Sequence, residues 1–117
     1  MENTKLYDLE IRTYQFAKRC RDYTHRITGT ITNIEYIKQL ARSSGSQAAN
    51  YIEANEALSK KDFIMRIKIC RKEAKSRLWL NLIETGADGN AKKEQEILIQ
   101  EAMELTMIFS SILKKAI

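Results

Sequence analysis

The residues that could do chemistry in this chain are few and dispersed. The only histidine is His25, and Asp22 lies three residues before it, within reach on a helix. Two groups do not make a metal site, and a di-iron helical bundle needs a pair of Glu-x-x-His motifs. Two carboxylate pairs also sit one helical turn apart: Glu53 with Glu56, and Glu101 with Glu104. Neither pair lies in an apolar setting that would tune an acid–base couple. We therefore predict a non-enzymatic protein with no catalytic residues, no metal and no cofactor.

The two cysteines, Cys20 and Cys70, fall on apolar faces of predicted helices, where a free thiol behaves as a small hydrophobic side chain. Two isolated cysteines make neither a disulfide framework nor a zinc site, so we expect buried thiols. The longest uncharged run, residues 43–52, is ten residues long and too short to cross a bilayer. The first residues lack the apolar stretch of a secretory signal. These features predict a cytoplasmic protein with no membrane partner.

The positive charge of the chain is concentrated in one segment. The sequence of 117 residues has 20 basic and 15 acidic side chains, a net charge of +5. Residues 60–77 contain eight basic and two acidic side chains, a local net of +6, which leaves twelve basic and thirteen acidic residues elsewhere. The segment therefore carries the whole excess. The length fits a single domain, residues 1–117.

Hydrophobic spacing predicts four helices and therefore an all-α fold, an up-down-up-down four-helix bundle. The chain has no proline to interrupt them. We expect helices from about Leu6 to Ile27, from Asn33 as N-cap to Ala57, from Ser59 to Thr85–Gly86, and from Ala91 to the C-terminus. Ser59 and Asp62 resemble a capping box, and the segment 86–90, with two glycines, an aspartate and an asparagine, is the clearest loop.

Two packing details follow from these helices. The expected inward stripe of the second helix is rich in small residues: Ile34, Ile37, Ala41, Ser44, Gly45, Ala48 and Ile52. A glycine inside a helix costs about 1 kcal/mol relative to alanine, so we expect close helix packing at Gly45 to compensate. On the last helix, Glu101 lies close to the apolar stripe. A carboxylate there needs a partner, and we expect an arginine, either Arg66 or Arg77.

The third helix separates into three sectors on a helical wheel. One apolar sector should enter the core: Phe63, Ile67, Cys70, Ala74 and Leu78. An adjacent sector, about 120° wide, is basic, and its members are Lys60, Lys61, Lys68, Arg71, Lys72 and Lys75. A second apolar stripe lies on the far side of the basic sector: Met65, Ile69, Trp79, Leu80 and Ile83.

Each outer sector has two interpretations. The second apolar stripe indicates self-association because exposed apolar patches usually mark partner surfaces, unless a broad core covers both stripes. The basic sector suits a phosphate backbone, unless its lysines are simply solvated or pair with Glu73 and with acidic residues of the fourth helix. We predict self-association through the apolar stripe and nucleic-acid binding, RNA in particular, through the basic sector.

The chain also resembles a known family in three segments. They are Gln39 to Ala54 (QLARSSGSQAANYIEA), Ser59 to Phe63 (SKKDF) and Arg71 to Ala74 (RKEA). These segments resemble bacterial four-helix bundle proteins encoded in intervening sequences of 23S ribosomal RNA genes. The resemblance extends from about Leu9 to Leu113, and its most specific part is Arg42-Ser43 with Asn50 and Glu53. Many family members have glycine where Ala54 stands here.

The resemblance implies an up-down bundle that assembles as a ring-like homopentamer without enzymatic activity. It also points to the related accessory variability proteins of diversity-generating retroelements, which have a positive surface and bind nucleic acid and a reverse transcriptase. The alternative function is therefore a protein-interaction subunit, such as a reverse-transcriptase accessory protein. We expect Asn50 and Glu53 to form a structural hydrogen-bonded pair between helices.

Overall fold

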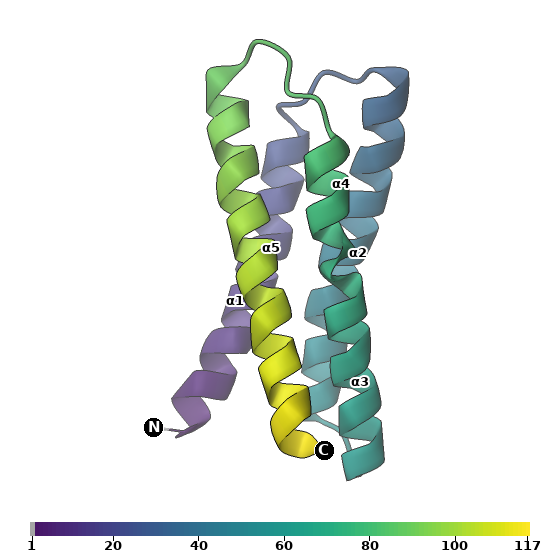
Figure 1. The fold of residues 1–117 in the computed structure, drawn as a ribbon, viewed down its shortest axis with the longest axis vertical. Coiled ribbons are helices and arrows are strands. Elements are labelled where there is room, and N and C mark those ends of the chain that lie inside the picture. Colours follow the sequence, from purple (N-terminus) through teal and green to yellow (C-terminus); the bar gives the residue numbers. More distant parts are fainter. Residues whose placement is uncertain (1) are drawn as a thin grey trace.

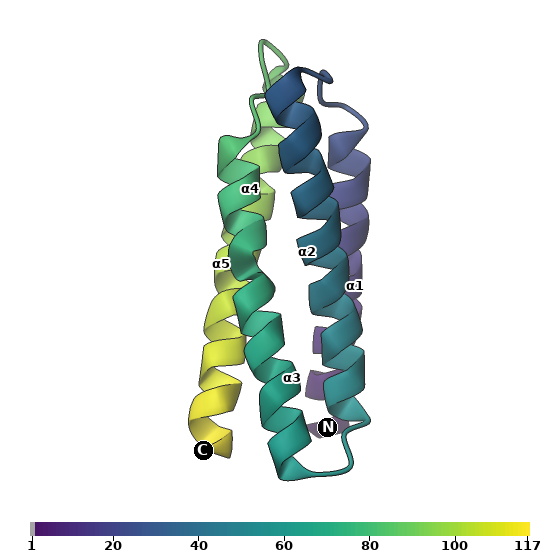
Figure 2. The ribbon, with the colours of Figure 1, turned by 90° about the vertical axis from the view of Figure 1, so that its right-hand side faces the viewer.

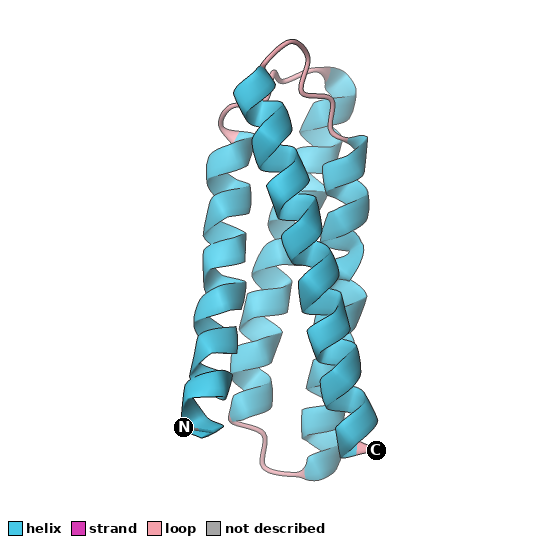
Figure 3. Ribbon diagram, turned by 60° about the vertical axis from the view of Figure 1, so that its left-hand side comes forward, coloured by secondary structure: helices cyan, strands magenta, loops and turns pink. Residues whose placement is uncertain are grey.

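The computed structural model describes residues 2–117, with side chains from Leu9 onward, and in this range the chain is all-helical, as predicted. Figures 1 and 3 show the helices and the short loops between them. The elements are α1 (Glu2–Thr24), α2 (Ile31–Asn55), α3 (Lys60–Lys72), the 3₁₀ turn η1 (Glu73–Lys75), α4 (Ser76–Leu82) and α5 (Gly89–Ala116). Leu6, the first residue of the predicted first helix, lies outside the described side chains.

The helices pack side by side into an elongated molecule of 47 × 27 × 19 Å. The α1–α2 and α4–α5 loops lie at one end, whereas the α2–α3 loop and both ends of the chain lie at the other (Figures 1 and 2). The elements α3, η1 and α4 follow one another along a single rod (Figure 2). Four rods therefore surround the core, as the spacing of apolar residues requires.

Large side chains from all four rods fill the core. Tyr51 of α2 packs on Phe109 of α5, with ring centroids 5.9 Å apart and planes tilted by 54°. The fully buried apolar residues include Phe16, Cys20, Leu40, Ile67, Leu98 and Leu105. Both cysteines are free thiols inside this core, as predicted, and burial raises the pKa of each to about 12.

The predicted inward stripe of α2 is wrong. Ile34, Ala41, Gly45 and Ile52 are exposed, and only Ser44 of the stripe is buried. The buried face consists instead of Asn33, Leu40, Ser43, Ser44, Gln47, Tyr51 and Ala54. A carbon placed as a Cβ at Gly45 would meet no atom within 4 Å, so no close intramolecular packing accounts for this glycine.

The polar residues on the buried face of α2 bind backbone groups, which is why they can be buried. Gln47 Nε2 donates to the carbonyl of Cys70 at 3.1 Å. Asn33 Nδ2 donates to the carbonyls of Thr28 and Glu84, and its Oδ1 accepts from the Glu84 N–H. Asn33 is therefore inside the helix, and Thr30 is the N-cap, because its side chain accepts from the Asn33 N–H.

The third predicted helix is interrupted by the 3₁₀ turn η1. A 3₁₀ helix turns 120° per residue and an α-helix 100°, so three residues of η1 rotate the following helix by roughly 60°. Ser76 Oγ lies 2.7 Å from Ser43 Oγ of α2 and donates to the carbonyl of Glu73, which ties the interruption to the neighbouring helix. The rod is therefore continuous in direction, but its faces before and after η1 do not align.

Candidate nucleic-acid interface

The start of α3 is set by the predicted cap. The Ser59 hydroxyl accepts from the Asp62 N–H at 3.0 Å. Ile67 and Cys70 then face the core, and both have no exposed surface. Gln47 Nε2 donates to the Cys70 carbonyl, and Cys70 Sγ donates to the Gln47 carbonyl at 3.5 Å. These two bonds between α2 and α3 fix the rotation of α3 about its axis.

Arg66 supplies a second link between α3 and α2. Its Nη1 donates to Asn50 Oδ1 at 3.0 Å, while Asn50 Nδ2 donates to the Ser46 carbonyl of its own helix. Asn50 therefore makes the interhelical bond that we expected, but with Arg66. Glu53 is exposed and is not its partner.

All the residues of the predicted basic sector are exposed: Lys60, Lys61, Lys68, Arg71, Lys72 and Lys75. We call this set the basic face. The first five lie on α3 and Lys75 ends η1. With a rise of 1.5 Å per residue, the face extends roughly 22 Å along the rod.

No side chain of the basic face forms an ion pair with any carboxylate of residues 9–117. The ion pairs in that range belong to six other cations: Arg12, Arg19, Arg21, Arg26, Lys38 and Arg66. Glu73, the acidic neighbour in the sequence, is half-buried and is bonded to none of the six cations of the face. Six cations without acidic partners repel one another, which favours binding of a polyanion.

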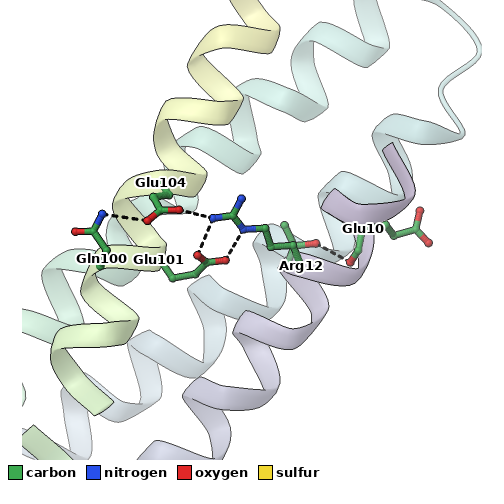
Figure 4. A network of polar contacts seen from close by, with 6 residues as sticks. Glu10, Arg12, Gln100, Glu101 and Glu104 are labelled. Atoms are coloured by element: carbon green, nitrogen blue, oxygen red, sulfur yellow. Dashed lines mark hydrogen bonds and ion pairs between the residues drawn. The ribbon is translucent and has the colours of Figure 1, made fainter. Parts of the chain in front are cut away.

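Three acidic residues of α5, Glu94, Glu101 and Glu104, pair with arginines of α1 instead. Arg12 Nε and Nη2 donate to the two carboxylate oxygens of Glu101 at 2.6 and 2.8 Å, and Nη2 also donates to Glu104 at 2.6 Å (Figure 4). These bonds raise the pKa of the Arg12 guanidinium. The pKa of Glu104 is lowered by the hydrogen bond from Gln100 and then by that from Arg12. Glu101 therefore has an arginine partner, as we expected, but the partner is Arg12 and neither Arg66 nor Arg77.

The second apolar stripe is only partly at the surface. Met65 is 49% exposed and Ile69 is half-buried, but Leu80 and Ile83 are 0% and 2% exposed. The prediction that Leu80 and Ile83 form an oligomer interface is wrong, because beyond η1 the core-facing side of the rod consists of Ser76, Leu80 and Ile83. Leu78, a predicted core residue, lies on the outward side there and is 50% exposed.

Trp79 also packs against other residues of the same chain. Its ring stacks on Tyr36 of α2, with centroids 6.1 Å apart and an angle of 24° between the planes. It is half-buried and packs against the core. Only Met65 and the exposed edges of Ile69 and Trp79 remain of the predicted stripe, so the stripe offers little surface to a partner.

Other chemistry is sparse in the described part of the chain. No group of three or more His, Cys, Asp or Glu residues lies close enough to hold a metal ion. His25 is exposed. None of the described helices is both long and apolar enough to span a bilayer. A shallow hollow at the start of α3 joins the basic face to Met65, and its lining is Ser59, Lys60, Lys61, Asp62, Ile64, Met65 and Lys68.

Comparison with known proteins finds a similarity at the level of structure. No protein-family model and no curated protein matches the chain significantly. A crystal structure of a protein of unknown function, from the S23 ribosomal protein family of Bacteroides thetaiotaomicron, has a similar fold, with a TM-score of 0.75. The two chains are 28% identical over 90% of this chain and 97% of the other. This likeness supports the helical fold along nearly the whole chain.

Proposed function

We propose that this protein is a non-enzymatic, self-associating up-down-up-down bundle that binds RNA through the basic face of the α3–η1 rod. The observation that carries the proposal is the set of six exposed cations on one side of the rod, none of which has a carboxylate partner among the described side chains. Each phosphate that contacts such a cation releases a counterion, which drives binding.

The resemblance to proteins encoded in 23S ribosomal RNA intervening sequences supports RNA as the polyanion. The similar crystal structure is of a protein assigned to a ribosomal protein family, although its function is unknown. Both observations support RNA as the polyanion in this proposal. Cytoplasmic location and assembly as a homopentamer, which the resemblance implies, are part of the same proposal.

Salt-dependent binding tests the proposal. If all six cations contact phosphates of single-stranded RNA, the logarithm of the binding constant should fall with the logarithm of salt concentration with a slope of about −4. We expect fluorescence anisotropy with a labelled RNA to give a slope between about −2 and −4, because some cations will not reach a phosphate. Binding that does not weaken with salt would contradict the proposal.

A charge-reversed variant locates the surface. In the variant Arg71→Glu/Lys72→Glu/Lys75→Glu, the slope should become shallower by about 2 and the affinity should fall at least tenfold. The matched control reverses three exposed cations elsewhere: Arg21, Arg26 and Lys92. It changes the net charge equally, so a local interface predicts a much smaller loss. Equal losses in both variants would mean that net charge alone attracts RNA.

Indifference to nucleic acid at low salt would leave the alternative function, a protein-interaction subunit such as a reverse-transcriptase accessory protein. A pull-down with a purified reverse transcriptase would then be the next measurement. Under that alternative, charge reversal of the basic face weakens the complex with the enzyme only if the enzyme presents an acidic surface.

A further inference from the structure

Two exposed helix faces of this protein have the same residue spacing. On α2, with its C-cap residue Glu56, the positions are Glu35, Lys38, Gly45, Ala49 and Glu56, separated by 3, 7, 4 and 7 residues. On α5 the positions are Lys93, Glu96, Met103, Met107 and Lys114, with the same separations. Steps of three, four and seven residues keep a row on one side of a helix. All ten residues are exposed except Met103, which is half-buried.

The charges of the two rows are opposite at three corresponding positions. Glu35 corresponds to Lys93 and Lys38 to Glu96, near the beginning of each helix. Glu56 corresponds to Lys114, near the end. Each of the three correspondences joins an acid to a base. Complementary charges of this kind fix the register of two helices.

The middle of each row is complementary in size. Met107 is 70% exposed on α5, a large apolar side chain in contact with water. The corresponding positions on α2 are the smallest available, Gly45 opposite Met103 and Ala49 opposite Met107. A Cβ added at Gly45 would meet nothing within 4 Å, so the space above it is open. Large side chains that enter such space form knobs-into-holes contacts.

We propose that α2 of one copy packs in parallel against α5 of the next copy of this chain, with the two rows in register. This inference rests on the self-association in the proposed function and identifies the surfaces that meet. The α2–α5 contact takes the place of the predicted interface on the apolar stripe of the third helix, where Leu80 and Ile83 are buried in the core. The contact joins different faces of the two copies, so each copy uses α2 toward one neighbour and α5 toward the other.

The direction and height of the two helices fit this arrangement. Both α2 and α5 run from the end with the α1–α2 and α4–α5 loops toward the other end (Figures 1 and 2). Copies that stand side by side in the same orientation therefore present α2 and α5 in parallel. The two exposed rows therefore run in the same chain direction, as their pairing in register requires.

Hydrogen bonds show that the paired positions also lie at similar heights. Asn33 of α2 binds the carbonyl of Glu84, and Gln95 of α5 binds those of Leu80 and Ile83, at the same end of α4. The proposed register places Asn33 opposite Ala91, which is about one helical turn from Gln95. Adjacent copies are therefore nearly level, as a closed ring requires, whereas a large axial step would produce a filament.

Charge exchange tests the contact. Lys38→Glu places two acids opposite each other at the junction with Glu96, and Glu96→Lys places two bases there. In each single variant, the subunit concentration for half-maximal assembly should rise at least about tenfold, because facing like charges are unfavourable at an interface. The double variant should restore assembly to near the wild-type concentration. The ion pair of Lys38 with Glu35 at 3.6 Å is exposed, so its loss has little effect.

The measurement is sedimentation velocity over subunit concentrations from about 1 to 100 μM, the range that separates weak from stable assemblies. Arg21→Glu is the control, because Arg21 is an exposed cation on α1 outside both rows. It should assemble like the wild type. A second variant, Gly45→Phe, fills the space for the methionines and should prevent assembly, while the open surroundings of Gly45 leave the subunit fold intact by circular dichroism.

The outcomes separate this inference from the proposed function. Stable assembly in both single charge variants and in Gly45→Phe overturns the α2–α5 contact but leaves self-association in place. A wild-type protein that remains a monomer at 100 μM overturns both the contact and self-association. RNA binding is measured independently through variants of the basic face, so neither result decides it.

Discussion

Gln95 offers the clearest test of how this bundle tolerates polar residues in its core. The side chain is 5% exposed, and its Nε2 donates to the carbonyls of Leu80 at 2.7 Å and Ile83 at 2.8 Å. These carbonyls belong to the end of the α3–α4 rod, where the helix cannot supply its own donors. The variant Gln95→Met preserves the length of the side chain and removes both hydrogen bonds.

The expected loss is worked from the two carbonyls. A buried acceptor left without a partner costs about 1–3 kcal/mol, so two cost about 2–6 kcal/mol. Part of this is offset because methionine buries apolar surface where the amide was. We expect the free energy of unfolding to fall by about 3 kcal/mol, a large share of the 5–15 kcal/mol that holds a typical domain together. The melting temperature should fall by about 10 °C.

Urea unfolding followed by far-ultraviolet circular dichroism measures this change. The protein concentration must be equal in all samples, because the proposed self-association would couple assembly to unfolding. The control is Gln100→Met, on the same helix but exposed, where the lost bond to Glu104 is at the surface. Its stability should stay within about 0.5 kcal/mol of the wild type. If Gln95→Met is no less stable than Gln100→Met, the carbonyls of α4 do not depend on the amide and the reasoning fails.

Two further predictions concern titrating groups. With thiol pKa values raised to about 12 by burial, Cys20 and Cys70 should react with iodoacetamide at pH 8 far more slowly in the folded protein than in 8 M urea; comparable rates would contradict their burial. In Arg12→Met, the lowered pKa of Glu104 should move up toward its ordinary value, observed by carboxyl-carbon NMR. Because the pKa of Glu104 is lower in the folded protein than in the unfolded chain, the ionised carboxylate stabilises the fold slightly at pH values above the unfolded pKa. This stabilisation is lost as the pH falls through the folded pKa. An unchanged Glu104 titration would show that Gln100 alone sets the shift.

The helices and the basic face could be predicted because they depend on local rules. Apolar residues recur every three or four positions, and charged residues such as Lys68 and Lys72 rarely lie in a core. The cap at Ser59 follows from residue types three apart. Each of these inferences needs only a short stretch of chain.

The buried face of α2 could not be predicted from hydrophobicity. Its core residues include Asn33 and Gln47, whose amides donate to distant backbone carbonyls, and Ser43, whose hydroxyl bonds the Leu40 carbonyl and the Ser76 hydroxyl. The isoleucines and alanines on the other side gave the stronger apolar pattern. The correct buried face of α2 could be predicted only with knowledge of the positions of the Cys70 and Glu84 carbonyls in the folded chain.

The interruption at η1 also left no local signal. Residues 73–75 are Glu, Ala and Lys, all compatible with a continuous α-helix. A helical wheel extended through them misplaces Leu78, Leu80 and Ile83. The partner of Glu101 was missed for a similar reason, since Arg12 lies 89 positions away in the chain.

The turn at η1 gives the rod two unlike halves. Before it, cations line the outward side; beyond it, Leu78 and Leu82 are 50% and 40% exposed. A polymer bound along the entire rod would contact the basic face first and then the exposed apolar side chains of Leu78 and Leu82. Added salt should therefore weaken the contacts of such a polymer with the cations of the basic face, but should have little effect on its contacts with Leu78 and Leu82.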